Sequence, residues 1–198
     1  GEYALWLIDT AGESFLAKPG EPLLQAVPGE AGIGELDSKG VQRVRFEDYA
    51  AHLGRARDQG IAMNARYVEN LGQQAILLEG AMDLLAQLSR RYKLAVATNG
   101  LTLVQRARLQ KSGLLPLLSG VFISQEMGLQ KPDKAYYSYI MEAFGDRAQD
   151  RYLMIGDSLS ADISGGVNAG IDTCWYHPAG LEAAEPQPTY TVRGYAEL

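Results

Sequence analysis

Four polar side chains each follow an apolar stretch of the chain, and together they could handle a phosphate group. Asp9, Thr98 and Asp157 come directly after apolar runs, and Lys131 follows another run by a short loop. A carboxylate can attack phosphorus and form an acyl phosphate, which divides one difficult step into two easier ones. A hydroxyl can hydrogen-bond a phosphate oxygen, and a lysine can stabilise charge that spreads over the phosphoryl oxygens. This set is therefore a candidate site for phosphate chemistry.

The acidic loop at residues 156–158, with Asp162 behind it, adds a metal ion to this interpretation. An incoming phosphate and a carboxylate repel each other, and Mg²⁺ relieves the repulsion by binding oxygens of both. Taken singly, Asp157 could be an ordinary turn residue and Asp162 an acid that stabilises a helix N-terminus. The occurrence of all these residues in one order is much harder to explain as coincidence, so we expect Mg²⁺ as the cofactor.

Apolar runs alternate with segments of helical periodicity, and this alternation predicts an α/β fold. The expected strands cover residues 4–8, 94–98, 120–124, 152–155, 173–176 and 190–192. The expected helices cover residues 81–91, 103–112, 134–144 and 160–169. Such a chain forms a Rossmann-like parallel sheet core with helices on both faces. Since the carboxyl ends of parallel strands line one crevice, the four polar side chains should converge there.

Residues 15–79 differ in character from both of their flanks. Residues 17–40 are rich in Gly, Pro and Glu and show no clear period, whereas a helical pattern returns over 45–70. We therefore expect residues 1–14 and 80–198 to form the α/β core. Residues 15–79 are expected to form a small, mostly helical cap inserted after the first strand.

The composition narrows the class of partner. A net charge of −6 and a sequence pI of about 5.0 argue against a protein that grips nucleic acid or an anionic membrane. The single cysteine, Cys174, cannot form an internal disulfide, which favours a cytoplasmic protein. An apolar stretch of roughly 18 residues is lacking, so we expect no membrane span. We expect a monomer or homodimer that acts on a small phosphorylated metabolite.

Three motifs, together with the aspartate after the first strand, make the sequence resemble the haloacid dehalogenase superfamily. They are Ala-Thr-Asn-Gly at 97–100, Gly-Leu-Gln-Lys-Pro-Asp at 128–133, and the segment 155–162, which begins Ile-Gly-Asp-Ser. The resemblance runs continuously over residues 76–180. Members of the superfamily are mostly Mg²⁺-dependent phosphatases. The turn at 98–100 and the strand at 173–176 look most like the branch that dephosphorylates noncanonical pyrimidine nucleoside monophosphates.

The resemblance implies roles for the residues that would handle phosphate. Asp9 is implied as the nucleophile and as a metal ligand. Thr98 and Asn99 are implied to hold the phosphate, and Lys131 to bridge the phosphate and Asp9. The implied activity is Mg²⁺-dependent hydrolysis of a small phosphomonoester through an aspartyl-phosphate on Asp9. The substrate that the resemblance favours is a nucleoside 5′-monophosphate.

The metal site is implied in the same way, with one departure from the family pattern. Asp157 is implied as a metal ligand and Asp162 as a supporting acid near the metal. The family's phosphatases carry a second Asp, the general acid and base, two residues after the nucleophile, where this chain has Ala11. Such a group contributes about 10²–10⁴-fold to the rate. The backbone carbonyl of Ala11 can still bind the metal, and Glu13 is near enough in sequence to be a substitute acid.

Ala11 leaves two alternatives to an active phosphatase. The first is a protein of this fold that binds Mg²⁺ and phosphate but turns over poorly or not at all. The second is a 2-haloacid dehalogenase, because dehalogenases of this superfamily also lack the second Asp. The complete acidic loop around Asp157 argues against the dehalogenase, because those enzymes need no metal and lack the full loop.

Overall fold

The computed structural model describes residues 3–6, 38–180 and 185–198 of the chain. These residues fall into two compact units that divide between Leu71 and Gly72. The larger unit contains the first strand and everything described from Gly72 onward. The smaller contains the described residues up to Leu71. The predicted site residues Asp9, Ala11 and Glu13 lie outside the described residues, and the predicted boundaries of core and cap stay a prediction.

A parallel sheet forms the centre of the larger unit. The described strands stand in the order β3-β2-β1-β4-β5-β6, and every neighbouring pair is parallel. The order reverses between β1 and β4, which is where an open α/β sheet forms its ligand crevice. Their bounds are Tyr3–Trp6 (β1), Lys93–Thr98 (β2), Gly120–Ile123 (β3), Leu153–Gly156 (β4), Asp172–Tyr176 (β5) and Tyr190–Val192 (β6).

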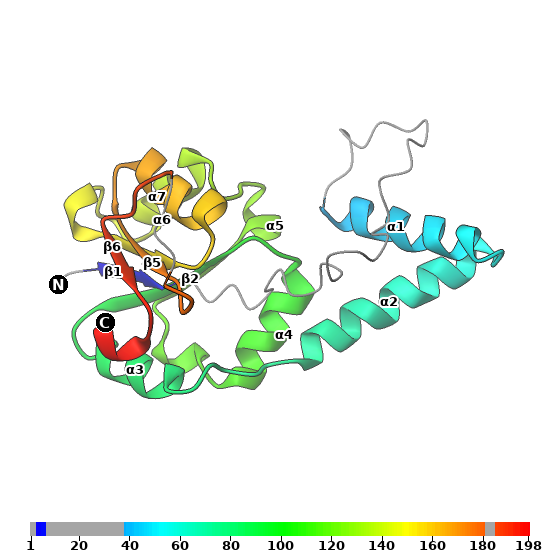
Figure 1. Cartoon of the computed structure of the whole chain (residues 1–198), viewed down its shortest axis with the longest axis horizontal. Coiled ribbons are helices and arrows are strands. Elements are labelled where there is room, and N and C mark those ends of the chain that lie inside the picture. Colours follow the sequence, from blue (N-terminus) through cyan, green and yellow to red (C-terminus); the bar gives the residue numbers. More distant parts are fainter. Residues whose placement is uncertain (1–2, 7–37, 181–184) are drawn as a thin grey trace. The chain divides into compact units, whose positions relative to one another are not determined.

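Helices cover both faces of this sheet. Figure 1 shows α6 and α7 on one side of the strands and α3 and α4 on the other. The bounds are Ala81–Leu88 (α3), Thr102–Ser112 (α4), Ser124–Met127 (α5), Lys134–Ala143 (α6) and Ser164–Ala169 (α7). The predicted Rossmann-like core with helices on both faces is therefore confirmed.

Each face of the sheet has its own hydrophobic core. Ala95 and Met154 pack with Tyr136 and Ile140 of α6, and all four are almost completely buried. Their neighbours in sequence, such as Leu94 and Ile155, belong to a second core together with Leu85 of α3. Because successive strand residues point to opposite faces, a strand covered on both sides reads as a continuous apolar run. This is why the apolar runs marked the strands correctly.

One predicted helix differs from the observed structure in a way that matters for the site. The sequence predicted a regular helix over residues 160–169. Instead, a π-turn spans Leu159–Ile163, and α7 begins only at Ser164. The backbone N–H of Ile163 donates to the carbonyl of Ser158, five residues back. Such wide turns insert an extra residue and redirect a side chain, and a helical hydrophobic period does not reveal them.

The smaller unit is helical in its described part. Helix α1 spans Ser38–His52, and α2 spans Arg57–Gln73 and so runs across the division into the larger unit. The two helices pack closely at Gly60, where an added Cβ would lie 2.6 Å from the carbonyl oxygen of Phe46. The Phe46 and Tyr67 rings lie 5.2 Å apart. Among all described residues, no helix combines the length and apolar character that a membrane crossing requires.

Candidate functional site

Three loops at the carboxyl edge of the sheet carry the described candidate residues. Thr98 is the last residue of β2, and Asp157 directly follows the last residue of β4. Lys131 lies in the loop between α5 and α6, downstream of β3. Lys131 donates to the carbonyl of Ala97 and to Asp162, and Asp162 also accepts from the Ser158 N–H, so these hydrogen bonds tie the loops together. The expected convergence of distant residues is thus visible for the described part of the site.

Lys131 and Asp162 form a fully buried ion pair. The Lys131 Nζ lies 2.7 Å from Asp162 Oδ1, and the two side chains are 0% and 1% exposed. The same Nζ donates to the backbone carbonyl of Ala97, at 3.0 Å. Charges out of contact with water must be paired and hydrogen-bonded to be tolerated. The ammonium is therefore held at one position, next to the end of β2.

The second carboxylate oxygen of Asp162 also accepts a hydrogen bond. Asp162 Oδ2 accepts a hydrogen bond of 3.0 Å from the backbone N–H of Ser158. Gly156 makes this possible, because a Cβ on Gly156 would lie 2.2 Å from that oxygen. Asp162 is thus a bridge between Lys131 and the acidic loop. Both of its oxygens accept hydrogen bonds that link the lysine loop to the acidic loop, and its role as a supporting acid near a metal stays a prediction.

Asn99 pairs with the backbone of Lys131 through both ends of its carboxamide. Its Oδ1 accepts from the Lys131 N–H and its Nδ2 donates to the Lys131 carbonyl, each at 2.9 Å. This reciprocal pair joins the turn after β2 to the loop that carries the lysine. The resemblance implied that Asn99 holds phosphate. These contacts make the Asn99 side chain a link to the Lys131 loop, and its role in holding phosphate stays a prediction.

Thr98 is buried and receives a hydrogen bond that the sequence did not suggest. Its Oγ1 accepts from Nε2 of Gln105, at 3.0 Å, and the two residues are 0% and 4% exposed. The turn that follows is held by Ser124, whose Oγ accepts from the N–H of Gly100 at 3.1 Å. The sequence alone did not point to Gln105. The available signal was weak: a polar residue within a helix, seven positions after Thr98.

The donor set around Asp157 fits a cation that prefers oxygen ligands. The side chain of Asp157 is exposed, and its backbone carbonyl accepts a 2.9 Å hydrogen bond from Nε1 of Trp175. Carboxylate and carbonyl oxygens are the ligands that Mg²⁺ prefers, whereas zinc favours Cys and His. Within the residues that the structure describes, no group of three or more His, Cys, Asp or Glu side chains could hold a metal. Asp9 and Ala11, which the resemblance implies as further ligands, lie outside the described residues.

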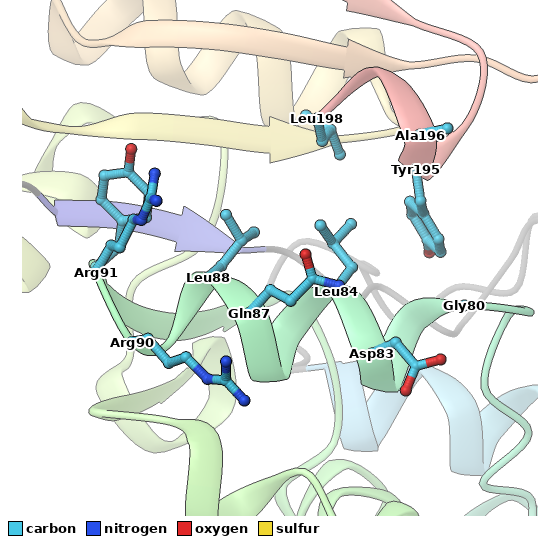
Figure 2. A pocket seen from close by; sticks show the side chains of 11 residues that line it. Gly80, Asp83, Leu84, Gln87, Leu88, Arg90, Arg91, Tyr195, Ala196 and Leu198 are labelled. Carbon is cyan, nitrogen blue, oxygen red and sulfur yellow. The ribbon is translucent and has the colours of Figure 1, made fainter.

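A groove of about 680 Å³ lies on another part of the larger unit, along α3 (Figure 2). Leu84 and Leu88 point from α3 toward the C-terminal residues 195–198, whereas Arg90 points away from them. The residues that line the groove are Gly80, Asp83, Leu84, Gln87, Leu88, Arg90, Arg91, Tyr92, Tyr195, Ala196 and Leu198. Among the described site residues, Thr98, Asn99, Lys131, Asp157 and Asp162 all lie outside this groove.

Comparison with known proteins places the chain among hydrolases. A sequence profile of haloacid dehalogenase-like hydrolases matches residues 11–170. The chain is 42% identical over 179 residues to the pyrimidine 5′-nucleotidase PynA of Streptococcus pneumoniae, covering 89% of this chain and 75% of that protein. It is 34% identical over 166 residues to the pyrimidine 5′-nucleotidase YjjG of Escherichia coli, covering 83% of this chain and 72% of that protein.

Solved structures give a consistent picture. The HAD-hydrolase YfnB of Bacillus subtilis, solved with bound magnesium, superposes with a TM-score of 0.72 at 36% identity, over 83% of this chain and 72% of that one. A 2-haloacid dehalogenase of Pseudomonas syringae superposes with a TM-score of 0.65 at 21% identity, over 80% of this chain and 68% of that one. The latter shows a shared fold only.

Proposed function

The chain belongs to the haloacid dehalogenase-like hydrolase family, and from that premise we propose that it is a Mg²⁺-dependent phosphatase acting on a nucleoside 5′-monophosphate. One observation carries the proposal. The buried Lys131 ammonium is held by Asp162 at the carboxyl edge of the sheet, close to Thr98 and the acidic loop. A buried cation fixed at a ligand crevice is suited to an anionic group such as phosphate.

Each residue then has a part in the reaction. A carboxylate oxygen of Asp9 attacks phosphorus, the ester P–O bond breaks, and the leaving oxygen takes up a proton from water or from the substitute acid Glu13. Water then attacks the acyl phosphate, which releases inorganic phosphate and restores the Asp9 carboxylate. The Lys131 ammonium has three N–H donors. The described contacts use two of them, and we assign the third to the transferred phosphoryl group.

We assign Mg²⁺ to Asp157, Asp9 and the carbonyl of Ala11. When bound, the ion supplies positive charge that offsets repulsion between carboxylate and phosphate. Asp162 takes no direct place among these ligands in our proposal, because its two oxygens already accept from Lys131 and Ser158. Asp162 contributes by holding the Lys131 ammonium and the acidic loop at fixed positions relative to each other.

The substrate class rests on the relatives. Two proteins that are 42% and 34% identical to this chain are named pyrimidine 5′-nucleotidases. We therefore propose a pyrimidine nucleoside 5′-monophosphate as substrate. The net charge of −6 agrees with a small-molecule substrate rather than a nucleic acid. Cys174 is the single cysteine and is a free thiol, which fits the proposed cytoplasmic setting.

The test is release of inorganic phosphate from a panel of nucleoside monophosphates and small phosphomonoesters, with Mg²⁺ and with a chelator. We expect release from pyrimidine 5′-monophosphates with Mg²⁺, and loss of release in the chelator and in the Lys131→Met variant. Folded protein that releases no phosphate from any member of the panel would overturn the proposal. Chloride release from a 2-haloacid without Mg²⁺ would favour a dehalogenase instead.

Ala11 supports a second candidate, in which the chain binds Mg²⁺ and phosphate but turns over slowly. The position lacks the acid that protonates the leaving group in the family's phosphatases. The Ala11→Asp variant separates the two candidates. A rise of about 10²-fold or more in kcat would show that the missing acid limits turnover. An unchanged kcat in an already active enzyme would show that another group, such as Glu13, does its work.

A further inference from the structure

We propose that Gln105 is a positioning residue that fixes the direction of the Thr98 hydroxyl, so that this hydroxyl donates to a phosphate oxygen. The inference deepens the proposed function and rests on it. A threonine hydroxyl has one O–H donor and two acceptor lone pairs, and its hydrogen can rotate to suit its partners. An unprotonated phosphate oxygen only accepts, so the hydroxyl binds such an oxygen only when its proton points toward it.

The contact between the two side chains sets that direction. Gln105 Nε2 is a donor, and it lies 3.0 Å from Thr98 Oγ1. The hydroxyl must therefore accept from Gln105, and its own proton must point elsewhere. If Gln105 presented an acceptor at the same place, the proton would turn toward it and away from the phosphate. The amide thus decides whether Thr98 meets an anion as donor or as acceptor.

Burial gives this contact its strength. Thr98 is 0% exposed and Gln105 is 4% exposed, so water competes little for either group. Hydrogen bonds gain electrostatic strength in such surroundings, and a donor that loses its partner there is costly. The Gln105 amide is therefore held against the hydroxyl before any ligand arrives.

The surrounding backbone keeps Gln105 in place. The residue lies in the first turns of α4, where its N–H donates to the carbonyl of Leu101 at 3.0 Å. Gly100 gives its side chain room, because a Cβ at that position would lie 2.6 Å from Gln105 Nε2. The Thr-Asn-Gly turn and the glutamine thus form one unit: the threonine offers the hydroxyl, the glycine clears the space and the glutamine aims the proton.

Two substitutions of similar size separate direction from packing. Gln105→Glu places an acceptor against Thr98, so the hydroxyl proton turns away from the phosphate and a negative charge is added. Gln105→Met removes the donor and leaves the hydroxyl free to rotate. We expect the Kd for inorganic phosphate, with Mg²⁺ present, to rise more than tenfold in the Glu variant and two- to fivefold in the Met variant. Gln110→Glu, on an exposed position of the same helix, is the matched charge control and should leave the Kd within twofold.

The pH dependence distinguishes a positioning role from simple loss of packing. A protonated glutamic acid can donate a hydrogen bond as the amide does. The ratio of the Gln105→Glu Kd to the unaltered Kd should therefore fall as the pH is lowered from 8 to 5. The Gln105→Met ratio should stay level over the same range. In a Thr98→Val background, Gln105→Met should weaken phosphate binding no further, because the hydroxyl that it positions is gone.

The measurement is titration calorimetry with inorganic phosphate as the probe, with circular dichroism melting to verify folding. If Gln105→Glu and Gln105→Met are folded and bind phosphate as the unaltered chain does, the inference is overturned. Phosphate binding and hydrolysis by the unaltered chain would still support the proposed function in that case. Absence of both from the unaltered chain overturns the two together. If Gln105→Glu does not fold, the Gln105→Met and Thr98→Val pair decides the question: additive losses overturn the inference, and a single shared loss supports it.

Discussion

Replacing Asp162 by Asn tests whether the buried ion pair with Lys131 organises the site. Asn keeps the shape of Asp but has one acceptor oxygen and one NH₂ donor in place of two acceptors. In the structure, Lys131 Nζ and the Ser158 N–H each donate to one oxygen of Asp162. In the variant, one of these two donors must face the new NH₂. In addition, the lysine charge loses its counter-charge.

The size of the effect follows from the burial of the pair. The two side chains are 0% and 1% exposed and lie 2.7 Å apart, so water cannot replace the missing partner. Removing one member of such a pair destabilises a protein by about 3–5 kcal/mol. Since domains of this kind unfold with a free energy of about 5–15 kcal/mol, the loss would be a large fraction of the total. We also expect Asp162→Asn to lose most of its phosphatase activity.

The assay is urea unfolding followed by circular dichroism. The double variant Asp162→Asn with Lys131→Met removes the unpaired charge, so it should be more stable than Asp162→Asn alone. Glu142→Gln is the matched control, because Glu142 pairs with Arg147 on the surface, where the side chains are 68% and 74% exposed. Exposed pairs contribute about 0–1 kcal/mol. A loss below about 1 kcal/mol in Asp162→Asn, or a double variant that is no more stable than Asp162→Asn, would refute the reasoning.

Four further outcomes follow from the structure. Gly156→Ala should lower the melting temperature and the activity, because its Cβ would lie 2.2 Å from a carboxylate oxygen, whereas Gly194→Ala, with open space around it, should change neither. Asn99→Ala removes two hydrogen bonds to the loop that carries Lys131. It should lower the free energy of unfolding in urea by about 1–3 kcal/mol and should lower kcat. Unchanged values of both would contradict a positioning role for Asn99. Asp157→Asn should raise the Mg²⁺ concentration needed for half-maximal activity at least tenfold. An unchanged Mg²⁺ concentration would show that Asp157 is not a metal ligand. Burial raises the pKa of the Cys174 thiol from 9.0 to about 11, so maleimide labelling at pH 8 should be much slower in the folded than in the urea-unfolded chain.

The raised pKa of the Cys174 thiol also makes the stability of the folded chain depend on pH. The folded state holds the thiol proton more tightly than the unfolded state, because burial disfavours the thiolate. Its contribution to stability is therefore fully present below the unfolded pKa near 9 and disappears as the pH rises toward about 11. Cys174→Ala should show a smaller loss of stability between these pH values than the unaltered chain, and an identical alkaline profile for both would contradict this account.

The apolar runs were enough to predict the parallel sheet. The strands ending at Thr98 and before Asp157 are covered on both faces, so their burial is written directly into consecutive apolar residues. The same pattern placed Thr98, Lys131 and Asp157 at one edge of the sheet, since topology alone determines which ends of parallel strands meet. These parts of the fold and of the site depend on local composition and connectivity.

The contacts within the site depend instead on tertiary packing. Lys131 and Asp162 are 31 residues apart and Asn99 and Lys131 are 32 apart, so no local period relates them. The π-turn that contains Asp162 leaves no mark in the hydrophobic spacing. Gln105 looks like any polar helix residue until α4 packs against the end of β2 and buries its amide against Thr98. Local composition and connectivity were therefore enough to place Thr98, Lys131 and Asp157 at the carboxyl edge, whereas the pairing of each donor with its acceptor followed from the packing of the loops. That pairing depends on burial and distances of a few ångströms, which arise only when the loops are packed together.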